Sequence, residues 1–496
     1  MHTHSYALLS DFHVLYSIWV IFIGKTMNSA KPLLNAVLLL SLVFPICISL
    51  DTIIPDQPIK DGQTLLSNQK TFALGFFSPD NSNRRYVGIW YYQITEQTVV
   101  WVANKDNPLN DTSGVLSIND HGNLILHSQN RTTPIWSANV SVSVSPTNNS
   151  MAQLLDSGNL VLVQQDNQRV KLWQSFDYPT NTMLPLMKLG LNRRTGINKY
   201  LTSWKSKDDM GTNNYSLGLD PSGYPQFFFY MNWVPLWRIG SWTGQGLGGV
   251  PKLTPKIFNF TFNFIFMNYQ DEITLMYSIT DLKALPKTRF VLHEWGTLQF
   301  FIWSESRWVG IPFTFEHCDK YLFCGPNGYC DPYNVDKFAC MCLPGFEPKS
   351  PRDWYLRDGS HGCMRKQGVS TCNTGEGFVK LAHVKVPDTS KALVNMSLSL
   401  EECEREYLRN CSCTAYSSTY ESEGVGCLRW HGELVDTRTF LNVGQDLYIR
   451  VDAVVLGIFY SFTKLHLLVF LTSYNVFEFT KYVTLPNTCP SNNAWC

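Results

Sequence analysis

Residues 122–126 read Gly-Asn-Leu-Ile-Leu, and the pattern returns as Gly-Asn-Leu-Val-Leu at residues 158–162. Tryptophans follow the two copies at similar distances, at Trp136 and Trp173, and Trp101 precedes Trp136 by a similar interval. Three units of one period indicate pseudo-threefold symmetry, because a unit this short cannot bury its apolar face alone. We therefore expect the three tryptophans to meet in a shared centre.

The sequence around these repeats is typical of β-structure. From Asp51 to about Phe176, short runs of aliphatic and aromatic residues are broken by Gly, Asn and Asp, with no helical period over a long window. From about Tyr200 to Phe315 the chain is again β-like, aromatic and rich in Trp. These patterns predict a mainly β, multi-domain protein.

Cysteines divide the chain into a front part and a disulfide-rich back part. After the N-terminal region no cysteine precedes Cys318, and two dense groups follow: Cys318, Cys324, Cys330, Cys340, Cys342 and Cys363, then Cys372, Cys403, Cys411, Cys413 and Cys427. Thiols at this density persist as disulfides only in an oxidising compartment, so we expect an extracellular or luminal protein. A zinc site or buried free thiols are the alternatives, but the close pairs are C-x-C without His at ligand spacing.

The N-terminal segment agrees with export. Residues 27–49 have the layout of a cleavable signal peptide, with Lys31 before an apolar run and a small-x-small pattern at its end. This interpretation leaves residues 1–26 as an unexplained upstream extension, and an uncleaved signal anchor is the alternative.

Glycosylation acceptors and charge support the same compartment. Eight N-x-S/T sequons occur, at Asn110, Asn130, Asn139, Asn148, Asn214, Asn259, Asn395 and Asn410. Only 16% of residues are charged, which suggests that glycans supply solubility. The balance of 40 basic and 40 acidic residues provides no basic field for nucleic acid, and we predict no nucleic-acid partner.

At this point the motifs resemble a known family. The repeats look like bulb-type lectin domains, which form a β-prism of three four-stranded sheets. The segments Leu172–Thr182 (LWQSFDYPTNT), Lys188–Gly190 and Tyr200–Ser206 (YLTSWKS) are very similar to S-locus glycoproteins and S-domain receptor-like kinases of plants. The resemblance runs from about Asp51 to Asp452.

The resemblance implies four domains after the signal peptide: a bulb-type lectin domain at residues 50–177, a β-rich S-locus glycoprotein domain at 200–315, an EGF-like module at 316–363 and a PAN/apple domain at 372–452. The S-locus region is expected to be a sheet-rich bridge. Ser399, followed by Glu402, predicts the capped start of a helix that ends near Arg409 in the last of these domains.

The resemblance also implies a candidate sugar site. Mannose-binding members carry a Q-x-D-x-N-x-V-x-Y strand, whose alternate residues point to one face. The first repeat supplies, as candidate sugar-binding residues, Asn119, His121, Asn123, Ile125 and His127, and the second supplies Leu155, Ser157, Asn159, Val161 and Val163. Leu155 and Val163 offer no hydrogen bond, so the second copy is interpreted as scaffold. A structural β-prism is favoured over high-affinity mannose binding, because a pocket that lacks its Asp loses an acceptor.

Disulfide pairs follow only from the likeness to the EGF-like and PAN/apple modules, since the sequence alone leaves many pairings open. The implied pairs are Cys318–Cys330, Cys324–Cys340, Cys342–Cys363, Cys403–Cys427 and Cys372–Cys411. Tyr407 stands where relatives usually have the cysteine that pairs with the equivalent of Cys413. We therefore expect Cys413 to be free or intermolecularly bonded and this domain to be less stable than its relatives.

Enzyme motifs are missing from the sequence. It contains no kinase signature set, no Gly-x-Ser-x-Gly and no His-Glu-x-x-His, so we predict neither enzymatic activity nor a cofactor, and no calcium site. The tail at 453–496 departs from the family pattern. Its apolar stretch 454–477, interrupted by Lys464, is either a membrane segment or translated intron or shifted-frame sequence.

These observations predict an extracellular, receptor-like recognition glycoprotein. The implied partners are a protein or glycan ligand, or a full-length S-domain receptor kinase, as in pollen self-recognition or immune signalling. The chain is expected to be secreted, or single-pass in the plasma membrane if residues 454–477 span it. The alternatives are a stand-alone mannose-type lectin and a nonproductive truncated gene product.

Overall fold

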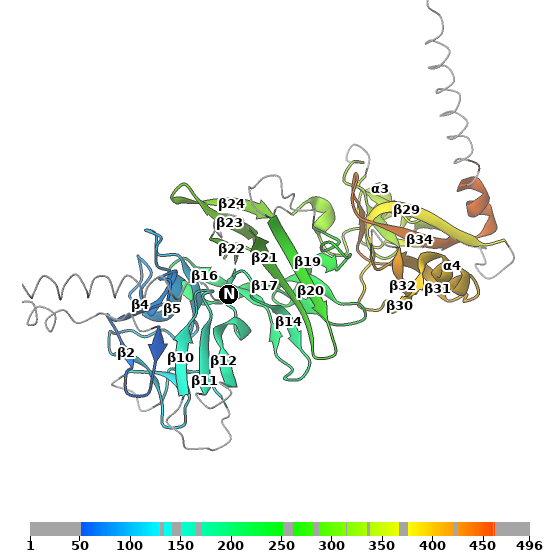
Figure 1. Ribbon diagram of the computed structural model, residues 1–496. Helices are drawn as coiled ribbons and strands as arrows, with labels where there is room; N and C mark the ends of the chain where they lie inside the picture. The colour runs from blue at the N-terminus through cyan, green and yellow to red at the C-terminus, as the bar shows by residue number, and fades with distance from the viewer. Residues whose placement is uncertain are drawn as a thin grey trace, which may run out of the picture. The chain divides into compact units, whose positions relative to one another are not determined.

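The computed structural model describes residues 51–128, 133–140, 150–164, 170–250, 261–280, 287–313, 315–334, 338–366, 375–420, 424–459 and 461. Strands predominate within these ranges and helices are short (Figure 1), which confirms the mainly β fold class. The predicted signal peptide and most of the tail lie outside the described residues.

The N-terminal part folds into three four-stranded sheets, the first three-sheet unit, drawn in blue and cyan in Figure 1. One sheet is a meander of β3 (Thr64–Leu66), β4 (Phe72–Phe77), β5 (Tyr86–Tyr91) and β6 (Val99–Val102). The next contains β2 (Ile59–Lys60), β7 (Gly114–Ile118), β8 (Leu124–Ser128) and β9 (Trp136–Ser137). The last contains β1 (Thr52–Ile53), β10 (Ser150–Leu154), β11 (Leu160–Gln164) and β12 (Val170–Gln174).

The repeated pattern explains two of these sheets. Gly122 and Gly158 have positive φ angles of 72° and 83° in the turns that precede β8 and β11, a conformation that glycine adopts without a steric penalty. The alternate leucines that follow point into the core, as Leu124 and Leu160 show with exposed fractions of 0% and 1%. The repeat therefore encodes a tight turn followed by a strand whose leucines face the core.

Trp101, Trp136 and Trp173 meet at the centre of the first three-sheet unit, as the period predicted. Their ring centroids lie 6.0, 5.9 and 5.7 Å apart in edge-to-face pairs. Each tryptophan comes from the fourth strand of a different sheet, so the three rings join all three sheets.

The S-locus region, expected to be a sheet-rich bridge, forms a second three-sheet unit. After the 3₁₀ helix η1 (Ser175–Asp177), one sheet contains β13 (Thr182–Met183), β22 (Thr288–Leu292), β23 (Leu298–Ser304) and β24 (Arg307–Phe313). Another contains β15 (Asn198–Lys199), β14 (Leu189–Asn192), β21 (Glu272–Thr280) and β20 (Thr261–Asn268). The remaining sheet is a meander of β16 (Leu201–Ser206), β17 (Asp209–Asp220), β18 (Gln226–Met231) and β19 (Val234–Ser241).

Both units follow one path. In each, the chain first contributes short strands to two sheets, then forms a complete meander, and then returns to complete the other two sheets. The second unit begins at Thr182, ahead of residue 200, where the sequence placed the start of this region. The sequence missed this relationship because the second unit lacks the Gly-Asn-Leu pattern of the first.

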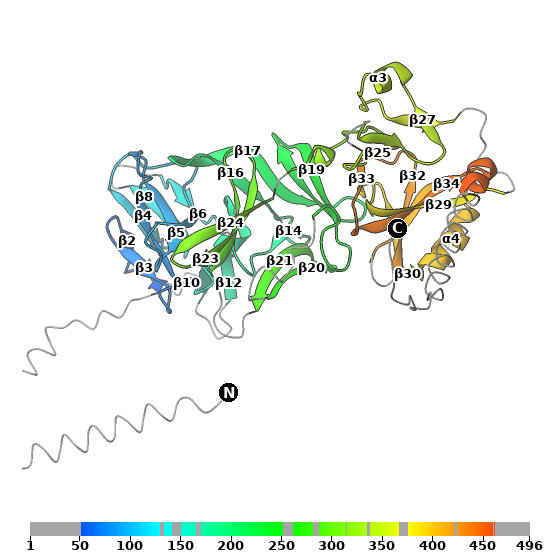
Figure 2. The same cartoon turned by 90° about the horizontal axis from the view of Figure 1, so that it is seen from above.

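The C-terminal part contains one eight-stranded sheet (Figure 2). Its order is β26 (Cys340–Cys342), β25 (Gly328–Cys330), β33 (Thr437–Thr439), β29 (Gly377–Lys385), β34 (Gln445–Val451), β31 (Cys413–Ser418), β32 (Val425–His431) and β30 (Leu393–Ser399). A hairpin of β27 (Phe346–Pro348) and β28 (Cys363–Arg365) and the short helices η3 (His317–Asp319), α3 (Pro351–Tyr355) and α4 (Leu400–Leu408) complete it. Helix α4 begins at the predicted capping box, where Ser399 Oγ accepts from the Glu402 amide at 3.2 Å.

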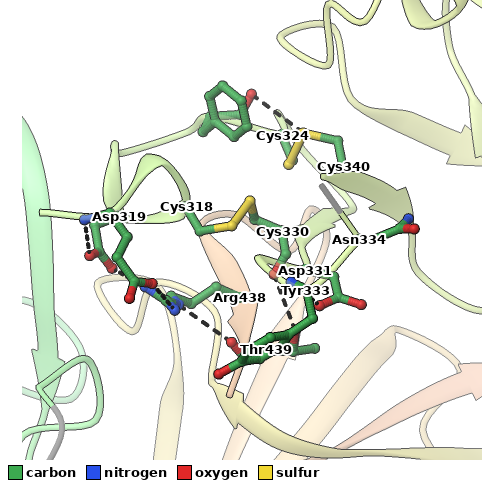
Figure 3. The surroundings of a disulfide bond; sticks show 12 residues. Cys318, Asp319, Cys324, Cys330, Asp331, Tyr333, Asn334, Cys340, Arg438 and Thr439 are labelled. Atoms are coloured by element: carbon green, nitrogen blue, oxygen red, sulfur yellow. Dashed lines mark hydrogen bonds and ion pairs between the residues drawn. A yellow bond between two sulfur atoms is a disulfide. The ribbon is translucent and has the colours of Figure 1, made fainter. Parts of the chain in front are cut away.

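The predicted EGF-like and PAN/apple spans share this sheet, because β25 pairs with β33 in parallel, Tyr329 opposite Thr437. Figure 3 shows the contact around the disulfide between Cys318 and Cys330. There Arg438 donates to Asp319 at 2.6 Å and to Glu316 at 2.7 Å. Two charge-assisted bonds and the pairing of β25 with β33 therefore join the two spans.

The structure contains the disulfides Cys318–Cys330, Cys324–Cys340, Cys342–Cys363 and Cys403–Cys427, the same pairs that the resemblance implied. Cys411 is also disulfide-bonded, but Cys372, its expected partner, lies outside the described residues. Cys413 is a free, buried thiol, and it belongs to one apolar cluster with Tyr407.

Candidate functional site

The first candidate sugar strand lies on the turn before β8 and on β8 itself. Asn123, Ile125 and His127 alternate with the buried Leu124 and Leu126, so they share the outward face of their sheet. The carboxamide oxygen of Asn119 accepts hydrogen bonds from the backbone amides of His121 and Asn123, at 3.1 and 2.9 Å. Asn119 therefore stabilises the turn.

The Asn123 carboxamide is committed to the fold. The Asn123 amide donates to Ser137 Oγ at 2.8 Å, and its oxygen accepts from the Val140 amide at 3.5 Å. Nδ1 of His127 is buried and has no hydrogen-bond partner among the described residues. His121 is exposed, and its backbone amide, rather than its ring, donates the hydrogen bond to Asn119 Oδ1. The structure places Asn123, Ile125 and His127 on one face and uses the carboxamides of Asn119 and Asn123 internally.

The second candidate strand has an apolar outward face. Val161 and Val163 are 6% and 5% exposed and form a cluster with Met151, against which Leu155 packs. Asn159 donates to Gln174 Oε1 at 3.0 Å and accepts from Ser175 Oγ at 3.1 Å. This copy therefore presents no cluster of hydrogen-bonding groups for sugar hydroxyls.

A third copy of this strand exists that the sequence did not reveal. Leu126 lies opposite Trp136 and Leu162 opposite Trp173, and Ile89 of β5 lies opposite Trp101 in the same way. Counting back from Ile89 places Tyr86 at the position of Asn123 and Asn159. No Gly-Asn-Leu pattern marks this copy, so only the register relative to the tryptophan identifies it.

The chain itself covers this third face. Arg84 forms an ion pair with Asp209 at the start of β17, and Tyr86 Oη donates to the same carboxylate at 3.4 Å. Met210 and Trp204, from β17 and β16, join Tyr86 in a hydrophobic cluster. The hairpin β16–β17 of the second three-sheet unit therefore occupies the third lectin-type face.

A deep concavity lies where the two three-sheet units meet, and we call it the junction cleft. Its volume is about 760 Å³, within the usual range for ligand sites, which favour domain junctions. Trp101, Trp136 and Trp173 line it from the first unit, and Tyr200 and Trp233 line it from the second.

Aromatic contacts hold the side chains of the junction cleft in place, and two of these rings, Tyr178 and Trp233, remain exposed. Trp101 Nε1 donates to the Tyr178 carbonyl at 2.9 Å, and the Tyr178 ring stacks on Trp173 with a centroid distance of 5.8 Å. Tyr200 packs edge-to-face on Trp233 at 5.0 Å. Tyr178 is 47% and Trp233 is 62% exposed. Such rings offer apolar faces to a sugar ring or to a peptide side chain.

Polar groups of the cleft mainly connect its two walls. Lys105 Nζ donates to Thr202 Oγ1 at 3.1 Å, and burial lowers the pKa of this lysine. The Asp106 carboxylate accepts from the amide and the hydroxyl of Thr212, at 2.7 and 2.9 Å. These bonds hold the walls together and stabilise a preformed cleft.

The described residues contain neither a metal cluster nor a helix able to span a membrane. They contain no cluster of His, Cys, Asp and Glu side chains suited to a metal ion. None of the helices in these ranges combines the length and the hydrophobicity that crossing a bilayer requires. The predicted membrane segment 454–477 lies mostly outside the described residues.

Sequon asparagines at Asn110, Asn139, Asn214, Asn395 and Asn410 are exposed, whereas Asn130, Asn148 and Asn259 lie outside the described residues. Among the exposed set, Asn139 alone lines the junction cleft.

Comparison with known proteins gives consistent matches along the chain. A D-mannose binding lectin model matches residues 98–205, an S-locus glycoprotein domain matches 237–350, and a PAN-like domain matches 372–437. The G-type lectin S-receptor-like serine/threonine-protein kinase RKS1 of Arabidopsis thaliana is 48% identical over 420 residues, covering 83% of this chain and 49% of the relative. The S-locus-specific glycoprotein S6 of Brassica oleracea is 36% identical over 405 residues, covering 79% of this chain and 89% of the relative. The chain thus spans about half the length of the receptor kinases it matches.

Proposed function

The chain belongs to the S-locus glycoprotein family and also matches about half the length of G-type lectin S-receptor-like kinases, and from this membership we propose that it is an extracellular recognition glycoprotein. Its ligand is a protein or a glycan. The disulfides of the C-terminal part support an oxidising compartment. The matched lectin and S-locus domains are binding modules rather than enzymes.

The junction cleft is the proposed ligand site. The observation that carries this proposal is the exposed ring of Trp233 beside a cleft of about 760 Å³. A large aromatic ring left in solvent next to a concave surface is a common anchor for a ligand. Hydrogen bonds already fix the two walls, so a ligand binds without the entropic cost of ordering them.

The motif strands act as scaffold in this proposal. A stand-alone mannose-type lectin would need the Asn123 carboxamide for a sugar hydroxyl, but that group already bonds Ser137 and Val140. Ligand capture is proposed to lead to pairing with a full-length S-domain receptor kinase, which the 48% identity to such kinases over more than 400 residues supports.

A binding screen with matched variants tests the proposal. The secreted protein is applied to a panel of immobilised oligosaccharides, including mannosides, and to a library of secreted plant peptides. Trp233→Ala is expected to weaken binding of any ligand at least tenfold, which corresponds to about 1.4 kcal/mol. Trp295→Ala is the control, because Trp295 is 55% exposed and does not line the cleft.

The alternative site makes the opposite prediction. If a mannoside binds, and Asn123→Ala abolishes that binding while Trp233→Ala preserves it, the strand rather than the cleft is the site.

A further inference from the structure

Two asparagines at equivalent places in the repeats have different environments. Asn104 ends the sequence Trp-Val-Ala-Asn and is 2% exposed. Its carboxamide accepts from the Val87 amide at 2.8 Å and donates to the Asn107 carbonyl at 3.1 Å. This asparagine is a structural residue.

Asn139 ends the matching sequence Trp-Ser-Ala-Asn but is exposed, with a left-handed φ of 53°. Its backbone amide donates to Ser137 Oγ at 3.0 Å, and its carboxamide makes no hydrogen bond within the described part of the chain. Asn139 also begins the sequon Asn-Val-Ser, whereas Asn104 is followed by Lys and Asp. The side chain that is internal in one repeat is therefore available for glycosylation in the other.

The location of Asn139 is what distinguishes it. It lies on the wall of the junction cleft, which also contains Trp136, Tyr200 and Trp233. An N-glycan on this residue begins with two N-acetylglucosamine rings. Each ring has an apolar C–H face that suits an aromatic side chain such as Trp233 or Tyr200 of the lining.

We propose that the N-glycan attached to Asn139 folds back into the junction cleft and is its intramolecular occupant. The Asn139 side chain is a short tether, and a short tether gives the attached glycan an effective concentration in the millimolar range near the cleft. A sugar that binds an aromatic cleft with a dissociation constant near 1 mM, too weak for capture from solution, then occupies the cleft for much of the time. An external ligand must displace this glycan, so glycosylation of Asn139 regulates the site.

This inference rests on the proposed function only for its regulatory consequence, because occupancy by the glycan does not require an external ligand. The two are therefore separable by experiment.

The probe is free N,N′-diacetylchitobiose, the disaccharide at the core of an N-glycan, titrated into the glycosylated full chain. Glycopeptide mass spectrometry first establishes that Asn139 is occupied. Asn139→Asp then removes the glycan and retains a residue that tolerates the left-handed backbone. The control Asn395→Asp removes a glycan from β30, away from the cleft lining.

Chitobiose is expected to bind the Asn139→Asp variant roughly fivefold more tightly than the wild type, because the tethered competitor is gone. The Asn395→Asp variant is expected to match the wild type. Adding Trp233→Ala to Asn139→Asp is expected to abolish the gain. An unmodified Asn139, or equal chitobiose affinity with and without its glycan, would overturn the proposal.

The binding screen with Trp233→Ala separates the cleft as a site for an external ligand from its occupation by the Asn139 glycan. Loss of an external ligand in Trp233→Ala, with no chitobiose effect at Asn139, supports the cleft as a ligand site and contradicts the glycan inference. A Trp233-dependent chitobiose gain without any external ligand supports the glycan inference and contradicts the proposed function.

Discussion

Arg238 on β19 and Asp436, just before β33, form a buried ion pair with 2.7 Å between Nε and Oδ2. Their side chains are 0% and 3% exposed. Lys385 of β29 reaches the same carboxylate oxygen at 2.9 Å. Arg238 also donates to the Val386 carbonyl at 2.6 Å. One carboxylate therefore pairs with two buried basic side chains and joins the second three-sheet unit to the eight-stranded sheet.

Asp436→Asn is expected to lower the free energy of unfolding by about 3–5 kcal/mol, because it removes the only carboxylate that pairs directly with both Arg238 and Lys385 in the described interior. Chemical denaturation followed by tryptophan fluorescence measures this loss. Asp446→Asn is the control, since Asp446 pairs with a half-exposed Lys380 at 2.6 Å and such pairs contribute at most about 1 kcal/mol. Equal effects of the two substitutions would contradict this account of the joint.

Asp388 predicts a specific loss of stability in acid. Burial acts to raise its pKa, but Arg238 and donors including Tyr321, at 2.6 Å, outweigh it and lower the pKa to about 2. Since the unfolded value is about 3.9, this contribution is complete above pH 4 and is lost as the pH falls toward 2.

The measurement compares wild type with Asp388→Asn between pH 6 and pH 2. A protonated aspartate resembles asparagine, so the difference in free energy of unfolding is expected to shrink by on the order of 2 kcal/mol as the pH falls from 4 to 2. A difference that stays constant over this range would show that Asp388 is not the titrating group.

Cys413 is expected to be a protected thiol. It is 1% exposed, and burial raises its pKa to about 11, so little thiolate forms near neutral pH. Iodoacetamide at pH 8 should leave Cys413 unmodified in the folded monomer and alkylate it in guanidinium chloride, as peptide mapping would show. Rapid alkylation of the folded monomer, or a blocked Cys413 in the unfolded one, would contradict a buried free thiol.

Short sequence patterns predicted several of the strands and turns and the start of one helix. The Gly-Asn-Leu repeat predicted two turns and two strands, because Gly122 and Gly158 occupy positive-φ positions and the leucines alternate inward. Ser399 and Glu402 marked the start of α4. Both signals act over a few residues, so sequence spacing is sufficient to reveal them.

The candidate site was only partly predictable. Asn123 and His127 lie on one face of the sheet, whereas Asn119 lies in the turn before β8, and the commitment of the Asn123 amide to Ser137 depends on where β9 ends. The covering of Tyr86 by the β16–β17 hairpin depends on contacts between residues far apart in the chain, such as Arg84 with Asp209. Residue patterns within a short stretch of sequence cannot predict such long-range contacts.

The sequence by itself determined the β-rich class, the period of the first three-sheet unit and the meeting of its three tryptophans, because short-range alternation and turn chemistry fix strands and their register. Only the tertiary structure decided that Trp233 and Asn139 line one cleft, that Asn104 is internal while Asn139 is exposed, and that Asp436 pairs with both Arg238 and Lys385. Those features arise where separate sheets pack together, and packing brings together residues whose distance along the chain carries no information about their contact.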